Sequence, residues 1–272
     1  MQLKQRAVTL TGRGEIEGKA VKTVASVLLL MAALALHGQE RTIHVLVALC
    51  DNVNQGIIKV PKRIGNGQDP ANNLYWGCGY GVKSFFRKHP DWTLVGQIRN
   101  PAGTIHERLV FKHERSPVFM TADAYDGAAI RQAIGDFMDY AAGLKKFYAA
   151  AGTLKVKAGG DADLICYAGH NGLMDFTIDL FPAGADDKPR EVVALACFSR
   201  DYFAEAVKKA GAYPLLWTTG LMCPEAYSLA AAIDSWIQRE PAERTRERAA
   251  QAYDRYQKCG IQAARRLFAT GF

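Results

Sequence analysis

Two potentially reactive residues, a histidine and a cysteine, each follow a short apolar run of the sequence. His170 comes shortly after Leu164–Tyr167, and Cys197 comes directly after Val192–Ala196. Short apolar runs bounded by charged residues or glycine are typical of fully buried strands. Because parallel sheets place their chemistry at the carboxyl ends of their strands, we expect the two side chains to lie close together. This pattern predicts a cysteine nucleophile with a histidine base.

Each of the two residues also has an ordinary structural explanation. A histidine in a glycine-rich turn is commonly hydrogen-bonded and inert, and a cysteine at a strand end is commonly a small buried side chain. For either residue alone this explanation is the more economical one, since position in a fold does not establish function. The occurrence of both at successive strand ends is what favours a Cys-His dyad.

The elements that must position this pair alternate between strands and helices. Further strands are expected over Thr42–Cys50, Trp92–Ile98, Leu109–Lys112 and Pro214–Thr218. Helices are expected over Gly77–Lys88, Gly127–Tyr148, Arg200–Ala210, Pro224–Gln238 and Pro241–Lys258. This alternation predicts a three-layer α/β/α sandwich with a mostly parallel sheet, formed by a single domain over residues 39–272.

Two connecting segments stand out in this pattern. Asn54–Trp76 is a long loop rich in glycine, proline and asparagine, and loops of this length are uncommon in compact domains unless they are functional. Between the two strands of the dyad lies a hairpin-like insert, Asp175–Leu180 followed by Pro182–Pro189. Asp175 and Asp179 alternate with apolar residues, which predicts that both line the solvent face of that hairpin.

The motifs LICYAGHNG and VVALACFS resemble those of the caspase-like cysteine peptidases, a family that includes caspases, metacaspases, legumains and gingipains. In that family an apolar strand ends in a His-Gly element, and the following apolar strand ends at the catalytic cysteine. His170 and Cys197 match these two positions, and the order of elements over residues 42–238 is similar. The chain departs from the pattern at Asn171, which separates His170 from Gly172, and at Phe198, where a glycine-rich continuation is usual.

The chemistry that this pair predicts is acyl transfer to the Cys197 thiolate, with His170 first protonating the leaving amine and then activating water. Backbone N–H groups of Gly172 and Cys197 are the expected donors to the oxyanion. We therefore expect the chain to be a cysteine endopeptidase that acts on a peptide or protein substrate. The sequence shows no feature that demands a metal or another cofactor.

Weaker candidates for the substrate pocket lie around the same strand ends, namely Asp51, Trp76, Ser199 and Thr218. In the resembling family the region of Asp51 helps to form the pocket for the residue before the cleaved bond, which implies a preference for Lys or Arg. A strand-end aspartate that caps the following turn is the alternative. Trp76, with Tyr75, is expected in a pocket wall or in packing at a helix start, and Ser199 is also a plausible N-cap.

The N-terminal segment carries a separate signal. Val24–Leu36 is an uncharged apolar run preceded by Lys19 and Lys22. It is too short for a comfortable membrane span, which needs about 20 apolar residues. It is typical of the hydrophobic region of a secretory signal, with 33–35 as a small-x-small cleavage site. We expect residues 1–38 to be a signal peptide or an N-terminal anchor and the protein to be periplasmic or secreted, with a buried N-terminal helix as the alternative.

Charge and cysteine content exclude other classes of function. The formal charge is +7, and the five basic and two acidic residues before position 36 account for +3 of it, which leaves a dispersed +4. Nucleic-acid binding is therefore poorly supported, and a membrane contact is expected only through the N-terminal segment. The six cysteines show no zinc spacing. A Cys197–Cys223 disulfide would lock up the nucleophile.

Two other functions stay open at this stage. A caspase-like domain without peptidase activity would serve as a peptide- or partner-binding module, and a disulfide at Cys197 or a His170 side chain in the core would favour it. A different α/β hydrolase is the third option, and no G-x-S-x-G motif supports it.

Overall fold

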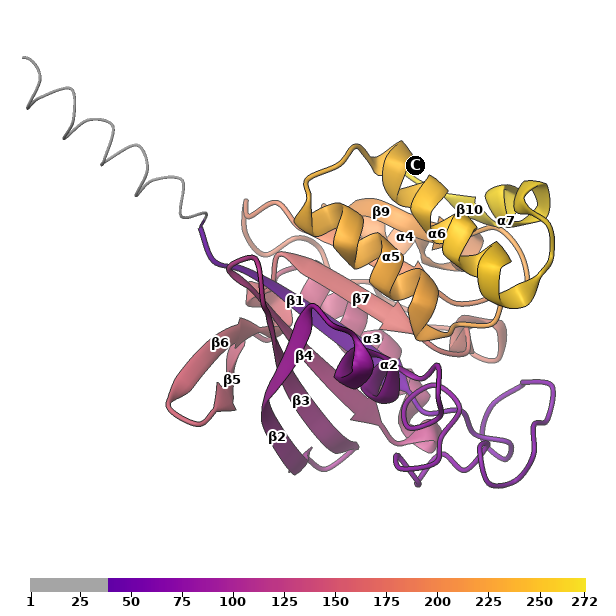
Figure 1. The fold of residues 1–272 in the computed structure, drawn as a ribbon, viewed down its shortest axis with the longest axis horizontal. Coiled ribbons are helices and arrows are strands. Elements are labelled where there is room, and N and C mark those ends of the chain that lie inside the picture. The colour runs from indigo at the N-terminus through magenta and orange to yellow at the C-terminus, as the bar shows by residue number, and fades with distance from the viewer. Residues whose placement is uncertain (1–38) are drawn as a thin grey trace, which may run out of the picture. The chain divides into compact units, whose positions relative to one another are not determined.

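A single large sheet organises the computed structural model, which describes residues 39–272. The segment Val24–Leu36 lies outside the described residues. Eight strands form the sheet in the order β10-β9-β8-β7-β1-β4-β3-β2 (Figure 1). The strands are β1 Arg41–Ala48, β2 Trp92–Ala102, β3 Ile105–His113, β4 Val118–Tyr125, β5 Phe147–Ala151, β6 Leu154–Ala158, β7 Leu164–Ala168, β8 Glu191–Leu195, β9 Tyr213–Thr218 and β10 Phe268–Ala269. The helices are α2 Val82–Lys88, α3 Ile130–Ala141, α4 Ser199–Ala210, α5 Ala226–Ile237, α6 Ala242–Gln257 and α7 Ile261–Leu267.

The central strands of the sheet are parallel and its edges are antiparallel. Strands β4, β1, β7, β8 and β9 run in one direction. Strands β3 and β10 pair antiparallel with β4 and β9, and β2 pairs antiparallel with β3. The predicted α/β class with a mostly parallel sheet is confirmed.

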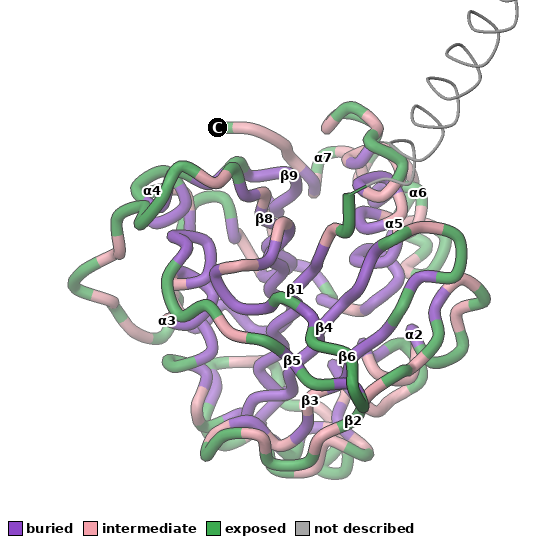
Figure 2. Tube along the Cα trace, turned by 90° about the vertical axis from the view of Figure 1, so that its left-hand side faces the viewer, coloured by how far each residue is buried: buried purple, intermediate pink, exposed green. Residues whose placement is uncertain are grey.

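Helices cover both faces of the sheet because the side chains of its strands alternate between two apolar cores. Along β1, Ile43, Val45 and Val47 belong to the core formed with α2, α5 and α6. Leu46 and Ala48 belong to the core formed with α3 and α4. Figure 2 shows the resulting pattern, in which the central strands of the sheet run through the buried interior and exposed segments lie around them. Residues 40–272 form one compact unit.

The structure differs from the expected elements at three places in the chain. Strand β4 was not expected, although it is buried along its whole length between β1 and β3. The helix expected over Gly127–Tyr148 ends at Ala141, since Gly143 adopts a positive φ of 79°, and the chain then forms the hairpin of β5 and β6. The insert after β7 is not a hairpin but a short 3-10 turn, Gly172–Met174, followed by an irregular loop to residue 190.

A buried polar group under the β5–β6 hairpin explains the unusual composition of β4. Asp123 is fully buried and accepts two hydrogen bonds from Arg108, at 2.7 and 2.6 Å. The Nε2 atom of His44 lies 3.1 Å from the same carboxylate, and the backbone N–H of Gly159 donates to its Nδ1 atom at 2.8 Å. Nδ1 is therefore the acceptor nitrogen and Nε2 the donor. The carboxylate is thus paired by two residues distant in sequence.

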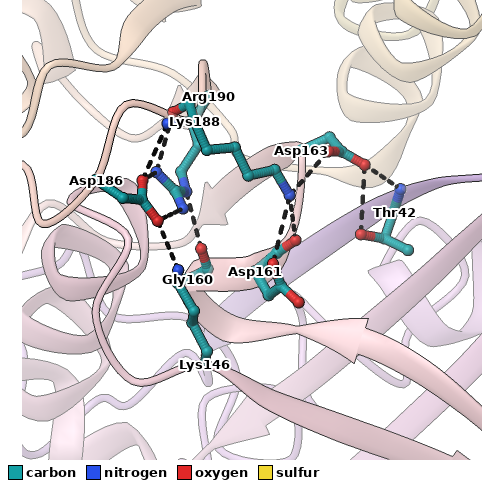
Figure 3. A network of polar contacts seen from close by, with 8 residues as sticks. All are labelled: Thr42, Lys146, Gly160, Asp161, Asp163, Asp186, Lys188 and Arg190. Atoms are coloured by element: carbon teal, nitrogen blue, oxygen red, sulfur yellow. Dashed lines mark hydrogen bonds and ion pairs between the residues drawn. The ribbon is translucent and has the colours of Figure 1, made fainter.

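A second network ties the irregular loop to the amino ends of the parallel strands (Figure 3). Arg190 donates to both carboxylate oxygens of Asp186, at 2.6 and 3.0 Å, and to the carbonyl of Gly160. Lys188 forms an ion pair with Asp163 at 2.9 Å, and Asp163 accepts the N–H of Thr42 at 2.7 Å. The hydrogen bonds of Arg190 and Lys146 hold the pKa of Asp186 below its usual value. The end of the loop at Arg190 is therefore fixed at the amino ends of the parallel strands, whereas His170 lies at their carboxyl ends.

Candidate active site

The loops that follow β1, β7, β8 and β9 surround one pocket at the carboxyl ends of the parallel strands. Its volume is about 320 Å³. His170, two residues after β7, and Cys197, two residues after β8, both line it. The expectation that neighbouring strand ends would bring these two side chains to one place agrees with this geometry.

Cys197 sits in a tight turn between β8 and α4. Its Sγ atom accepts the backbone N–H of Met222 at 3.4 Å and lies 3.7 Å from the Met222 carbonyl oxygen. The next residue, Phe198, adopts a positive φ of 51°, which is uncommon for a bulky side chain. Its N–H donates to Gly220 O at 2.9 Å. The turn is therefore held in a strained conformation by the loop after β9, as is common at functional sites.

His170 is buried and is oriented by a carboxylate from its own loop. Its Nε2 atom lies 2.7 Å from Oδ2 of Asp175, whose side chain is 31% exposed. The same carboxylate oxygen accepts the backbone N–H of Gly56 at 2.8 Å. The hydroxyl of Tyr167 donates to the carbonyl of His170 at 2.7 Å. The contact with Asp175 therefore occupies Nε2 of His170, and Nδ1 is the ring nitrogen left to exchange a proton with a substrate or a thiol.

Asn171 joins the histidine loop to the cysteine turn. Its side chain is fully buried, its Nδ2 atom donates to the carbonyl of Cys197 at 2.7 Å, and its Oδ1 atom accepts the N–H of Leu173 at 3.1 Å. The residue that interrupts the expected His-Gly pair is thus a direct link between the two candidate catalytic segments.

The long loop after β1 forms one wall of the pocket, and two buried amides hold it against the strand end. The Asn73 side chain accepts the N–H of Cys50 at 3.0 Å and donates to the Cys50 carbonyl at 2.8 Å. Gln55 donates to the carbonyl of Leu49 at 2.8 Å and accepts the N–H of Asp51 at 3.2 Å. Side chains of the loop therefore make the hydrogen bonds to the backbone after β1 that a neighbouring strand would otherwise make.

Three titratable groups in the pocket wall, Tyr75, Cys223 and Glu225, have pKa values raised toward their neutral forms. Burial raises the pKa of Tyr75, and the nearby Cys50 raises it further. Burial raises the pKa of Glu225, partly offset by a hydrogen bond from Tyr227. Burial and the carboxylate of Glu225 raise the pKa of Cys223. No lysine or arginine is found among the described residues that line the pocket.

The structure places the weaker pocket candidates away from this lining. Asp51 accepts the N–H groups of Val53 and Asn54, so it caps its own turn as the alternative interpretation expects. Trp76 is fully buried and donates to Glu107 at 2.6 Å. Ser199 and Thr218 are fully buried and hydrogen-bonded to each other at 3.0 Å, behind the cysteine turn. The proposed charge selection by Asp51 therefore has no free carboxylate to support it.

Gly172 is a further candidate that does not line the pocket. A side chain at this position would meet the Phe176 ring and the Ile134 side chain, in the apolar core around α3. The N–H of Cys197, the other expected oxyanion donor, has no hydrogen-bond acceptor within residues 39–272. Of the two residues expected to supply oxyanion donors, only Cys197 lines the pocket.

The partner of His170 was missed at the level of sequence. Asp175 was assigned to the solvent face of a hairpin, and the structure instead directs it at His170. The signal was a carboxylate five residues after the histidine, with a 3-10 turn between them that reverses the chain. Alternation with apolar residues concealed this signal, because the same spacing fits a strand.

Disulfides, clusters of metal ligands and helices able to span a membrane do not occur among the described residues. All six cysteines lie within the described part of the chain, and all are free. No cluster of three or more potential metal ligands occurs within residues 39–272. None of the helices in that range is both long and apolar enough to cross a membrane.

Comparisons with known proteins found no relative. No family model matches the chain, and neither the curated proteins nor the solved structures contain a match.

Proposed function

We propose that the chain is a cysteine peptidase of the caspase-like type, with Cys197 as nucleophile and His170 as general acid and base. One observation carries the proposal: a free Cys197 and a His170 oriented by Asp175 line the same pocket. Perturbed or oriented groups that converge in one pocket are the usual mark of an active site. The resemblance of the motifs and the parallel order β1-β7-β8-β9 support the same assignment.

The reaction proceeds by acyl transfer. The thiol proton of Cys197 passes to Nδ1 of His170, since Nε2 is held by Asp175. The thiolate adds to the carbonyl carbon of the scissile amide, and the negative oxygen accepts the N–H of Cys197. His170 then protonates the amine as the C–N bond breaks, which leaves a thioester on Cys197. Water, deprotonated by His170, hydrolyses the thioester and restores the thiol.

Asp175 has a supporting role in this scheme. Its carboxylate accepts the proton-bearing Nε2 of His170 and so keeps the ring in one orientation while Nδ1 exchanges its proton. The predicted signal segment over Val24–Leu36 adds export to the proposal.

Thiol reactivity of the full chain tests the proposal. A mild alkylating reagent is applied across a range of pH, and each cysteine is followed by mass spectrometry. We expect Cys197 to label faster than Cys223 and Cys78, and His170→Ala to slow the labelling of Cys197 alone. A peptide-library digest then reports hydrolysis, which Cys197→Ser abolishes and Cys259→Ser leaves intact, because Cys259 is exposed and does not line the pocket.

Uniform labelling of the cysteines, together with no cleavage in the library, would overturn the proposal. The binding-module interpretation would then account for the same pocket.

A further inference from the structure

Apolar side chains dominate the pocket beside Cys197. The loop after β1 supplies Ile57, Ile58, Val60 and Leu74, and the loop after β9 supplies Leu221 and Met222. These segments are more than 140 residues apart in the sequence, since one ends at Leu74 and the other begins at Leu221. Two loops that are distant in the sequence thus both contribute apolar side chains to one pocket.

Two of these side chains are unusually exposed for their type. Ile58 is 91% exposed and Leu221 is 68% exposed. Met174, on the histidine loop, adds a third exposed apolar side chain to the same pocket. Exposed apolar side chains that gather at one cavity mark a binding site, whereas scattered ones need no explanation.

The charges at the pocket fit an uncharged occupant. Asp51 is occupied by its own turn. Glu225 accepts the Tyr227 hydroxyl at 3.0 Å and the Gln257 amide at 3.3 Å, and burial raises its pKa. Both hydrogen bonds are accepted by the Oε2 atom, so this oxygen of Glu225 is partnered by residues of α5 and α6. A cationic side chain entering the pocket would lose its water among mostly apolar side chains, and Glu225 supplies the single carboxylate among the described residues of the lining.

We propose that this pocket binds a large apolar side chain of the substrate, such as that of Leu, Met or Phe, at a residue next to the cleaved bond. This inference rests on the proposed peptidase function. The cavity volume of about 320 Å³ lies at the lower end of ligand pockets, which suits one side chain and its neighbouring backbone.

Peptide substrates that differ only at the residue before the cleaved bond test the specificity. We expect kcat/KM with Leu, Met or Phe to exceed that with Lys, Arg, Asp or Ala by about tenfold or more, the discrimination typical of a hydrophobic pocket. The highest kcat/KM with Lys or Arg would overturn the inference and leave the peptidase function standing.

Matched substitutions in the loop after β1 locate the pocket. Ile58→Glu places a charge in the lining, and Val53→Glu places one in the same loop at a residue that is 87% exposed and outside the lining. We expect Ile58→Glu and Leu221→Glu to lower kcat/KM for the apolar peptides by about tenfold, and Val53→Glu to change it by less than about twofold. Equal effects of Ile58→Glu and Val53→Glu would contradict the inference.

Binding to the inactive chain separates the two proposals. Calorimetry with Cys197→Ala protein and the same peptides reports affinity without cleavage. Tighter binding of apolar peptides, weakened by Ile58→Glu, supports the pocket assignment even if the native chain cleaves nothing. No preference for apolar peptides in this experiment overturns the assignment, whatever the result of the cleavage assay.

Discussion

At the scale of single residues, the arrangement of Asp175 gives the candidate site a third member. Its Oδ2 atom receives both the His170 ring and the N–H of Gly56, so one carboxylate oxygen links the histidine loop to the loop that forms the pocket wall. Gly56 permits this approach, because a Cβ atom there would lie 2.2 Å from the carboxylate. The orientation of His170 and the position of the pocket wall are therefore coupled.

Asp175→Asn tests this coupling. We expect kcat to fall by about tenfold or more, since general acid-base transfer depends on the orientation of the imidazole. KM for a cleaved peptide should rise as well, because the same substitution weakens the contact between the Asp175 carboxylate and the N–H of Gly56 in the pocket wall. Steady-state kinetics measure both constants. Asp179→Asn, in the same exposed loop, is the matched control, and an equal loss of kcat in both variants would remove Asp175 from the site.

At the scale of elements, the buried amide of Asn73 holds the long loop to the end of β1. It makes hydrogen bonds to both backbone groups of Cys50 and to the carbonyl of Asn66, at distances between 2.8 and 3.0 Å. The loop thereby stays in place without a strand or helix between residues 49 and 81. Its order comes from side-chain amides rather than from a backbone ladder.

Asn73→Ala removes these bonds. Each buried backbone group left unpaired costs about 1–3 kcal/mol, so we expect a clear loss of unfolding free energy in urea and a loss of peptide cleavage. Asn66→Ala changes an exposed side chain of the same loop and should alter stability by about 0.5 kcal/mol or less. Similar unfolding midpoints for the two variants would show that the Asn73 bonds do not hold the loop.

The central polar group on β4 predicts a pH dependence of stability. Burial alone would raise the pKa of Asp123, but the hydrogen bonds from Arg108 and His44 hold it below its usual value. A carboxyl whose pKa is lower in the folded state stabilises the fold above its unfolded pKa and loses this effect as pH falls through the folded pKa. The contribution of Asp123 is thus complete at neutral pH and declines in acid.

Asp123→Asn measures that contribution. Breaking a buried pair by removing one partner costs about 3–5 kcal/mol, so the variant should be strongly destabilised at pH 7. The difference from the unsubstituted chain should narrow as the pH falls below about 4, because the carboxyl then takes up a proton in the unfolded chain before it does so in the folded chain. Urea unfolding at several pH values checks this. A difference that widens toward acid would show that Asp123 is not ionised in the folded chain.

The same residue shows where sequence reasoning stops. Strands β1, β7, β8 and β9 were predicted closely, because apolar residues predominate in their runs and the runs are bounded by turns. Strand β4 carries Asp123 in its second half, and only the partners Arg108 and His44 make that residue tolerable in a core. The hydrophobic pattern of β4 alone therefore cannot reveal hydrogen-bond partners that come from β1 and β3.

The candidate site divides in the same way. The strand ends, and with them His170 and Cys197, follow from local apolar pattern and the rule for parallel sheets. The walls do not, because they are irregular loops whose paths depend on single side-chain bonds such as those of Asn73 and Asp51. The sequence therefore leaves Asp51 as a pocket candidate, whereas in the structure both of its carboxylate oxygens accept hydrogen bonds from its own turn.

At the scale of the whole molecule, the two cores on either face of the sheet share the strands that separate them. Residues of β7 alternate between the cores, with Cys166 on the side of α5 and Tyr167 on the side of α3. Loss of either helical layer therefore exposes one face of the strands whose other face forms the core with the remaining layer. This arrangement predicts that residues 40–272 unfold as one cooperative unit, as single domains commonly do.

Buried cysteines report on that cooperativity. Cys50 and Cys166 are fully buried, and burial raises the pKa of Cys50 to about 11 and that of Cys166 as well, so neither should react with a thiol reagent in the native state. Exposed Cys259 should react at once. In rising denaturant we expect Cys50 and Cys166 to become reactive at the same concentration in pulse labelling followed by mass spectrometry. Labelling of Cys50 at a distinctly lower concentration would mean that the loop after β1 opens independently, and that the pocket wall is less stable than the sheet that carries His170 and Cys197.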